Sequence, residues 1–196
     1  MLALLRTLGW IACVIYSTIP AFWLLIHPLA PFWRSRPRSA YWILLPIWIG
    51  IWALAAAISA SWRGATLYEN RWTWIPAAAL FCAGLVLYKL SHSGFSLTQL
   101  GGLPEVLPDH SQRLVTTGIR ARVRHPVYLG HLFEMLAWSV GTGLAVCWAL
   151  TAFAVASGIV MIRMEEAELE KRFGAEYVAY RRRVPAILPS FFHDSR

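Results

Sequence analysis

The chain has 196 residues, enough for one domain of ordinary size, and it is 58% hydrophobic but only 14% charged. Soluble domains are close to half apolar and a quarter charged, so this composition excludes an ordinary soluble protein and predicts an integral membrane protein. The net charge of +8 is compatible with nucleic-acid binding, but basic loops on the cytoplasmic side of a membrane explain it more simply. We therefore expect a lipid bilayer and no nucleic acid as partner.

The first half of the chain is built from apolar runs separated by polar ones. We expect membrane spans at about residues 8–26, 41–62 and 72–90, with a Pro- and Arg-rich loop at 27–38 and a polar stretch at 63–71. The three cysteines all fall inside apolar runs without CxxC spacing. They predict buried thiols rather than a disulfide framework or a metal site.

The second half begins with a long polar segment, residues 91–124, whose length favours a functional loop. Residues 127–162 are then apolar throughout, and one helix of that length would run ~54 Å, beyond the ~30 Å hydrocarbon core. We expect a helical hairpin broken at Gly141-Thr142-Gly143. Its second arm should continue to Phe173 and stop at Gly174, before a short helix at 175–183 that Pro185 ends.

These elements predict one all-α transmembrane domain, residues 1–196, of about five spans. The three N-terminal spans are residues 1–90, and residues 91–196 hold the long loop, the hairpin and the C-terminal helices, where we expect the functional site. With the N-terminus outside, fifteen Lys and Arg residues lie on the inner side against three outside, which is a strong positive-inside bias. The C-terminus and the loop 91–124 are then cytoplasmic.

Titratable residues gather where the hairpin begins, in "RHPVYLGHLFEML" (124–136). Interfacial anchoring explains Arg124, Pro126 and Tyr128, but it does not explain His125, and the density of such groups favours a functional site. Where the last span ends, Glu165 lies within a turn of the hydrocarbon and is a better candidate than its neighbours. We expect Glu168 on a solvated face, paired with Arg172 four residues later.

His131 and Glu134 lie three residues apart, so they share one helix face. A central charge facing lipid would cost ~2.5–3.5 kcal/mol, so both should face the bundle interior. A pair that only satisfies itself and a pair that binds substrate are equally compatible with the sequence. The motifs of soluble nucleotide-binding and hydrolytic enzymes are missing, so any cofactor must be held by the helix ends.

Four stretches together resemble the isoprenylcysteine carboxyl methyltransferases, a family of membrane enzymes. They are "RLVTTG" (113–118), "RHPVYLG" (124–130), "SVGT" (139–142) and "EEAELEKRFGAEYVAYRRRVPAILP" (165–189). The ordered pattern RHPxYxG, EExxL and FGxxYxxYxxxVPxxxP covers about 80 residues, whereas residues 2–90 match only as hydrophobic spans.

The resemblance implies S-adenosyl-L-methionine as methyl donor, without a metal, and it implies where the donor binds. The cofactor-binding positions carried over are Gln112, Arg113, Leu114, Val115, Arg120, His125, Pro126, Val127, Tyr128 and Glu165. The family has a substrate-binding Arg where this chain has Met161, so Arg163, two residues later, is expected to act in catalysis with Arg124. His131 and Glu134 are expected on the acceptor side.

The function predicted is methyl transfer from S-adenosylmethionine to a lipophilic acceptor reached from the bilayer. Such an in-line displacement needs alignment and exclusion of water rather than a metal. A small thiol or a phospholipid amine remains open as acceptor. Two further alternatives are an NADPH-dependent membrane reductase, which the Glu pair and the FGxxYxxYxxxVP pattern disfavour, and a small transporter, which does not explain titratable groups clustered at one membrane edge.

Overall fold

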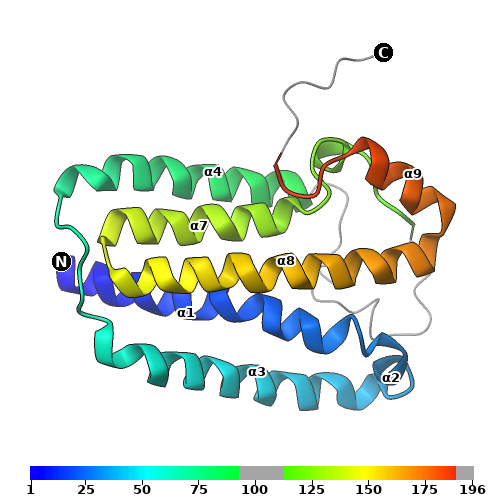
Figure 1. Ribbon diagram of the computed structural model, residues 1–196, viewed down its shortest axis with the longest axis horizontal. Helices are drawn as coiled ribbons and strands as arrows, with labels where there is room; N and C mark the ends of the chain where they lie inside the picture. The colour runs from blue at the N-terminus through cyan, green and yellow to red at the C-terminus, as the bar shows by residue number, and fades with distance from the viewer. Residues whose placement is uncertain (93–112, 189–196) are drawn as a thin grey trace.

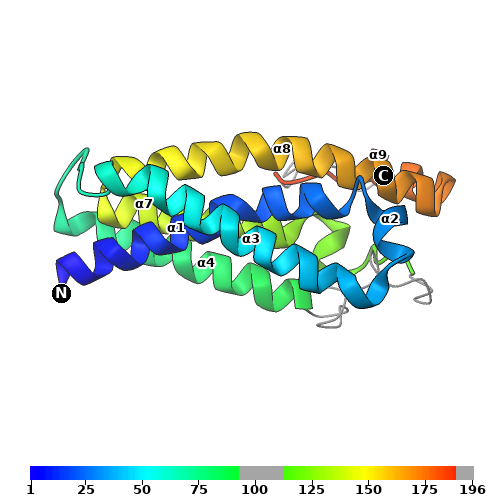
Figure 2. The same ribbon diagram turned by 90° about the horizontal axis from the view of Figure 1, so that it is seen from below.

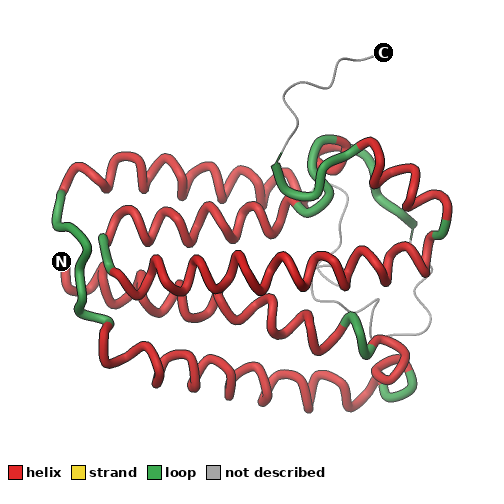
Figure 3. The backbone as a smooth tube through the Cα atoms, in the orientation of Figure 1, coloured by secondary structure: helices red, strands yellow, loops and turns green. Residues whose placement is uncertain are grey.

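The computed structural model describes residues 1–92 and 113–188. Seven α-helices occur in these residues: α1 (Leu2–Ile26), α2 (Ala30–Arg34), α3 (Pro37–Ser59), α4 (Trp74–His92), α7 (Pro126–Thr142), α8 (Ala145–Phe173) and α9 (Ala175–Arg183). Three short 3₁₀ turns accompany them, η1 (Ala60–Trp62), η2 (Arg71–Thr73) and η3 (Gly118–Ala121). Over the same two ranges there is no sheet, so the predicted all-α class is confirmed (Figure 3).

Four helical segments are long and apolar enough to cross a bilayer: Leu2–Ile26, Ala40–Trp62, Arg71–Ser91 and Ala145–Phe173. Their large apolar side chains point outward, most clearly on α3, where Trp42 is 83% exposed and Leu54 61%. Exposed apolar surface on every long helix is what a surrounding bilayer requires. The chain is a multi-pass membrane protein.

Helix α7 is shorter, with 17 residues, and it is the most enclosed element of the bundle. It packs against α4, α1 and α8, whereas α3 packs mainly against α1 (Figures 1 and 2). Figure 1 shows α7 between α4 and α8, shorter than α8, which continues beyond it toward α9. The N-terminus lies at one end of the bundle and α9 at the other, here called the α9 end.

The turn between α7 and α8 confirms the predicted hairpin break. Gly143 caps α7 with φ 66°, a left-handed conformation that glycine adopts without strain. A Cβ there would lie 2.3 Å from the carbonyl oxygen of Tyr68. The linker before α4 holds this turn, because Leu67 N–H donates to Gly143 O at 2.8 Å and Ala145 N–H to Ala65 O at 2.9 Å.

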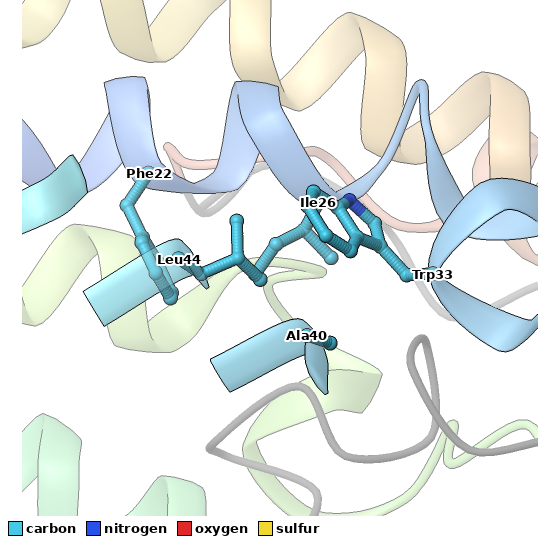
Figure 4. Close-up of a cluster of buried hydrophobic side chains, with 5 residues drawn as sticks. All are labelled: Phe22, Ile26, Trp33, Ala40 and Leu44. Atoms are coloured by element: carbon cyan, nitrogen blue, oxygen red, sulfur yellow. The ribbon is translucent and has the colours of Figure 1, made fainter. Parts of the chain in front are cut away.

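At the α9 end, an apolar cluster joins the first three helices. Phe22 and Ile26 of α1, Trp33 of α2, and Ala40 and Leu44 of α3 are buried against one another (Figure 4). The Trp33 indole N–H donates to the Leu25 carbonyl at 2.7 Å, which folds the short α2 back onto α1. This cluster fixes the position of the residue that follows α1, His27.

The predicted ends of the last two helices are confirmed. α8 stops at Phe173, Gly174 has φ 57°, and α9 runs to Arg183. The expectation of three buried thiols is wrong at one position. Cys13 and Cys147 are buried between α1 and α8, but Cys82 is exposed because α4 turns that face away from α7.

Candidate functional site

The site begins where the chain enters α7. Pro126 occupies the first helical turn, where its missing N–H costs nothing. The backbone N–H groups of Arg124 and His125, just before it, donate to the carbonyls of Pro185 and Ala186, both at 3.0 Å. The segment after α9 is thereby attached to the start of α7, which explains why residues about 60 positions apart form one site.

The Arg124 side chain connects three helices. Its Nε donates to Glu166 Oε1 of α8 at 2.9 Å, and its Nη2 forms a second contact with the same oxygen. Its Nη1 donates to the carbonyls of Arg181, at 3.0 Å, and Val184, at the end of α9. The side chain is only 8% exposed, and its bonds satisfy a charge that burial would otherwise destabilise.

His125 lies between two carboxylates. Its Nδ1 is 3.4 Å from Glu165 Oε2, and its Nε2 is 3.1 Å from Glu166 Oε1. Burial alone would lower the pKa of His125, but the two carboxylates outweigh that effect and raise it to about 9. The ring is therefore an imidazolium at neutral pH. It stacks on Tyr128 with ring centroids 5.6 Å apart and an interplanar angle of 17°.

Three groups in this site have buried polar atoms without a hydrogen-bond partner among the described residues. They are Glu165, through Oε2, His27, through both ring nitrogens, and Tyr177, through its hydroxyl. His27 interacts electrostatically with Glu165 and stacks on Trp23 at 5.2 Å. Unsatisfied buried polar atoms are costly, and they suggest a ligand that supplies the missing bonds.

The loop before η3 forms one wall of the site. Leu114 packs against Tyr177, Tyr180 and Val184 of the α9 region. The Tyr180 hydroxyl donates to the Arg120 carbonyl at 2.7 Å, and the Arg120 guanidinium donates to the Ser91 carbonyl at the end of α4 at 3.3 Å. Burial lowers the pKa of Arg120. The structure thus brings Leu114 and Arg120 to the same end of the bundle as His125.

Other predicted residues lie differently. Gln112 falls outside the described residues. Arg113 is exposed, Val115 and Val127 are partly exposed, and Pro126 is buried. Arg163 is exposed on α8, whereas Met161, the position it was expected to replace, is 1% exposed. The structure therefore does not bring Arg163 to Arg124.

His131 and Glu134 both face the interior of the bundle, as expected, but no hydrogen bond joins them. His131 lies among the rings of Tyr16, Tyr88 and Tyr128, with centroids 5.2, 5.5 and 6.2 Å away. Glu134 is 2% exposed and its Oε1 has no hydrogen-bond partner within residues 1–92 and 113–188. The mutual satisfaction that the sequence allowed is absent.

Two residues of the site were not predicted. Glu166 was ranked below Glu165, yet it binds both Arg124 and His125. His27 was assigned to a plain loop. A third expectation, that Glu168 is solvated, is wrong. Its predicted pairing with Arg172 is confirmed at 2.6 Å, but it also pairs with Arg34 of α2 at 3.0 Å and is only 14% exposed.

Comparison with known proteins gives relatives of two kinds. Protein-S-isoprenylcysteine O-methyltransferase of Rattus norvegicus is 31% identical over 151 residues, which is 68% of this chain and 50% of the relative. Protein-S-isoprenylcysteine O-methyltransferase B of Arabidopsis thaliana is 36% identical over 92 residues, or 44% of this chain and 45% of the relative. Methanethiol S-methyltransferase 2 of Bradyrhizobium diazoefficiens is 30% identical over 171 residues, or 84% of this chain and 56% of the relative.

No family model matches the chain, and no solved structure gives a significant match. The chain spans about half the length of the curated relatives it matches. The chain is a distant homologue of the isoprenylcysteine carboxyl methyltransferases, in a family that also includes a methanethiol S-methyltransferase.

Proposed function

We propose that this protein is an integral-membrane methyltransferase that transfers a methyl group from S-adenosylmethionine to a lipophilic acceptor reached from the bilayer. Members of the family use S-adenosylmethionine as methyl donor. The observation that carries the proposal is the pair of unsatisfied groups, Glu165 and His27, beside the imidazolium of His125. Together, Glu165, His27 and His125 can bind a ligand that carries both a positive and a negative charge.

The donor set fits S-adenosylmethionine chemically. Its ammonium group or ribose hydroxyls can satisfy Glu165 Oε2, which lacks a hydrogen bond. Its carboxylate suits the cationic His125 and a ring nitrogen of His27. The bound donor supplies an electrophilic methyl group. The protein aligns it and excludes water, with Tyr128 and Leu114 as apolar surface near the charged groups.

The proposal also concerns the class of molecule that accepts the methyl group. A prenylated cysteine carboxylate, as in the O-methyltransferases, and a small thiol, as in the S-methyltransferase, are both compatible with the site. The second has support of its own, because the methanethiol relative aligns over 84% of this chain. A phospholipid amine and a reductase reaction have no counterpart among the relatives reported above.

The membrane topology proposed has five spans, with α7 as the fifth and the site at the cytoplasmic face. The course of α7, which runs antiparallel to α4 and α8, supports it, as does the excess of Lys and Arg on the side of the site. A reporter fused after Arg196 should then be cytoplasmic. A signal from the other side of the membrane would contradict both the topology and the cytoplasmic site.

Calorimetry in detergent tests the cofactor. S-adenosylhomocysteine should bind the purified protein and NADPH should not. Glu165→Gln should weaken that binding roughly ten- to a hundred-fold, the cost of a charge-assisted hydrogen bond. Glu170→Gln is the matched control, because Glu170 is a half-exposed residue of the same helix, paired with Arg181 at 2.8 Å. If NADPH binds and S-adenosylhomocysteine does not, the protein is a reductase and the proposed methyltransferase function is wrong.

A further inference from the structure

A line of rings leads from the charged site into the bundle. His125 stacks on Tyr128, and Tyr128 lies 6.2 Å from His131, centroid to centroid. His131 then contacts Tyr16 of α1 and Tyr88 of α4. From His125 to His131 the axial rise along α7 is about 9 Å. The His131 ring is therefore the first titratable group beyond the proposed cofactor site in the direction of the bilayer.

Behind this ring lies a carboxyl group without a partner. Glu134 is three residues further along the same helix and is packed against Gly84 of α4, where an added Cβ would come 2.8 Å from Glu134 Oε1. Neither His131 nor Glu134 forms an ion pair with an Arg or Lys in the two described ranges. The carboxyl is thus not neutralised by a neighbouring cation, although it is almost fully buried.

We infer that His131 accepts the proton of a neutral, apolar thiol during methyl transfer, and that Glu134 is the positioning residue that stabilises the resulting imidazolium. The inference rests on the proposed methyltransferase function and names the acceptor class. His131 is partly exposed, whereas Glu134 is fully buried behind it. A small acceptor that enters the bundle can therefore reach the imidazole before the carboxyl.

The step balances in atoms and charge. The S–H bond of the thiol breaks, its proton goes to a ring nitrogen of His131, and the electron pair left on sulfur forms the bond to the methyl carbon. The bond from that carbon to the donor sulfonium breaks, and its electron pair neutralises the sulfonium. The products are a thioether, S-adenosylhomocysteine and an imidazolium, so one positive charge moves from the donor to His131.

The surroundings of His131 suit that charge. The rings around His131 are Tyr16 from α1, Tyr88 from α4 and Tyr128 from α7. Glu134 lies three residues further along α7, and Glu165 of α8 lies beside Tyr128. Aromatic faces attract a cation electrostatically, and a carboxylate one turn away does so more strongly.

The same surroundings disfavour the other acceptors. A carboxylate is already ionised and releases no proton on methylation, so it gives His131 no proton to accept. An amine is protonated at neutral pH and would bring a second cation beside the donor sulfonium. A thiol is neutral, enters hydrocarbon readily and has one proton to give.

The test uses the full-length protein in detergent with S-adenosylmethionine and three acceptors: a long-chain alkanethiol, an S-farnesylcysteine derivative with a free carboxylate, and a phosphatidylethanolamine. Only the alkanethiol should be methylated. His131→Phe keeps the ring shape and should lower kcat/KM for the alkanethiol by roughly 10²- to 10⁴-fold, as loss of a general base does. Glu134→Gln should lower it roughly ten-fold.

An aryl thiol, which is already ionised at neutral pH, separates proton acceptance from structure. Both variants should lose far less kcat/KM with this thiol than with the alkanethiol, and they should still bind S-adenosylhomocysteine. Methylation of the carboxylate or the amine in place of the thiol would overturn the inference, as would equal losses with both thiols. If the wild-type protein fails to bind S-adenosylhomocysteine, the proposed function itself is wrong.

Discussion

At the N-terminus of α7, both cationic side chains have carboxylate partners. Arg124 and His125 are bonded to Glu165, Glu166 and the carbonyls at the end of α9. Two turns further along the same helix, Glu134 is equally buried and has an oxygen with no partner among the described residues. The two cations of the first region hold helices together, although Glu165 beside them also has an unpartnered oxygen, whereas no cation is paired with Glu134 among the described residues. Substituting Arg124 or His125 should therefore lower stability, and substituting Glu134 should lower turnover.

The largest effect is expected at Arg124. Arg124→Gln would leave Glu166 as a buried carboxylate whose strongest remaining partner is His125, and it would release the end of α9. Breaking a buried pair costs about 3–5 kcal/mol, so we expect a large fall in Tm by thermal unfolding in detergent. Arg181→Gln is the control. Its ion pair with Glu170 is 39% and 41% exposed, and its loss should cost less than about 1 kcal/mol. Equal effects would mean that Arg124 is not the residue that holds the three helices.

The second-largest effect is the dependence of stability on pH, which also arises at the N-terminus of α7. Because the pKa of His125 is raised to about 9 from an ordinary value near 6.5, its ion pairs stabilise the folded protein fully below pH ~6.5. That contribution, on the order of 3 kcal/mol at about 1.4 kcal/mol per pKa unit, is lost as pH rises through 9. We expect the free energy of unfolding to fall over this window, measured by urea titration at several pH values.

His125→Gln should be less stable and should show a flatter pH dependence between pH 6.5 and 9. A wild-type protein whose stability does not change over this range would show that the two carboxylates do not hold His125 protonated. The residual slope in the variant measures all other groups, the tyrosines of α9 among them.

The next effect tests the second region. Gly84→Ala places a methyl group 2.8 Å from Glu134 Oε1, and because that carboxyl is buried it cannot move into solvent. Gly50→Ala on α3 is the matched control, because nothing lies within 4 Å of its Cβ position. Alanine stabilises a helix by about 0.5–1 kcal/mol relative to glycine, whereas overpacking costs about 1–3 kcal/mol. The first variant should therefore be about 1–3 kcal/mol less stable than the second. If both gain stability alike, Glu134 does not face α4.

Helix boundaries were predictable because local chemistry sets them. Gly143 and Gly174 end helices through their own backbone freedom, and Pro126 starts one, so neighbouring residues alone carry the information. The motif around His125 also lies at the end of the bundle where the predicted residues Leu114, Arg120 and Glu165 gather. What the sequence did not reveal depends on contacts between distant segments. Glu166 became a site residue through partners 41 and 42 positions earlier.

His27 was missed for a related reason. It follows α1 in a Pro-rich loop whose composition indicates only a turn, and it reaches Glu165 because α2 folds back onto α1 through the cluster around Trp33. Similarly, the pattern that pairs Glu168 with Arg172 is local and was predicted, while the contact with Arg34 spans 134 positions and was not. A signal for either residue would require knowledge of which helices pack together.

The smallest effect is expected for Glu168→Gln, which removes ion pairs with Arg34 of α2 at 3.0 Å and with Arg172 at 2.6 Å. All three side chains are partly exposed, so the loss should be about 1 kcal/mol in thermal or urea unfolding. Of the two ion pairs of Glu168, the pair with Arg34 is the more informative. A pair within α8 stabilises only that helix, whereas the pair with Arg34 would hold α2, and with it His27, against the α8 segment that carries Glu165.

A double-mutant cycle of Glu168→Gln with Arg34→Gln measures this second contribution. Coupling of a few tenths of a kcal/mol or more, together with weaker S-adenosylhomocysteine binding in Arg34→Gln, is the expected result. Strictly additive changes with unaltered binding would assign Glu168 to the surface of α8 alone.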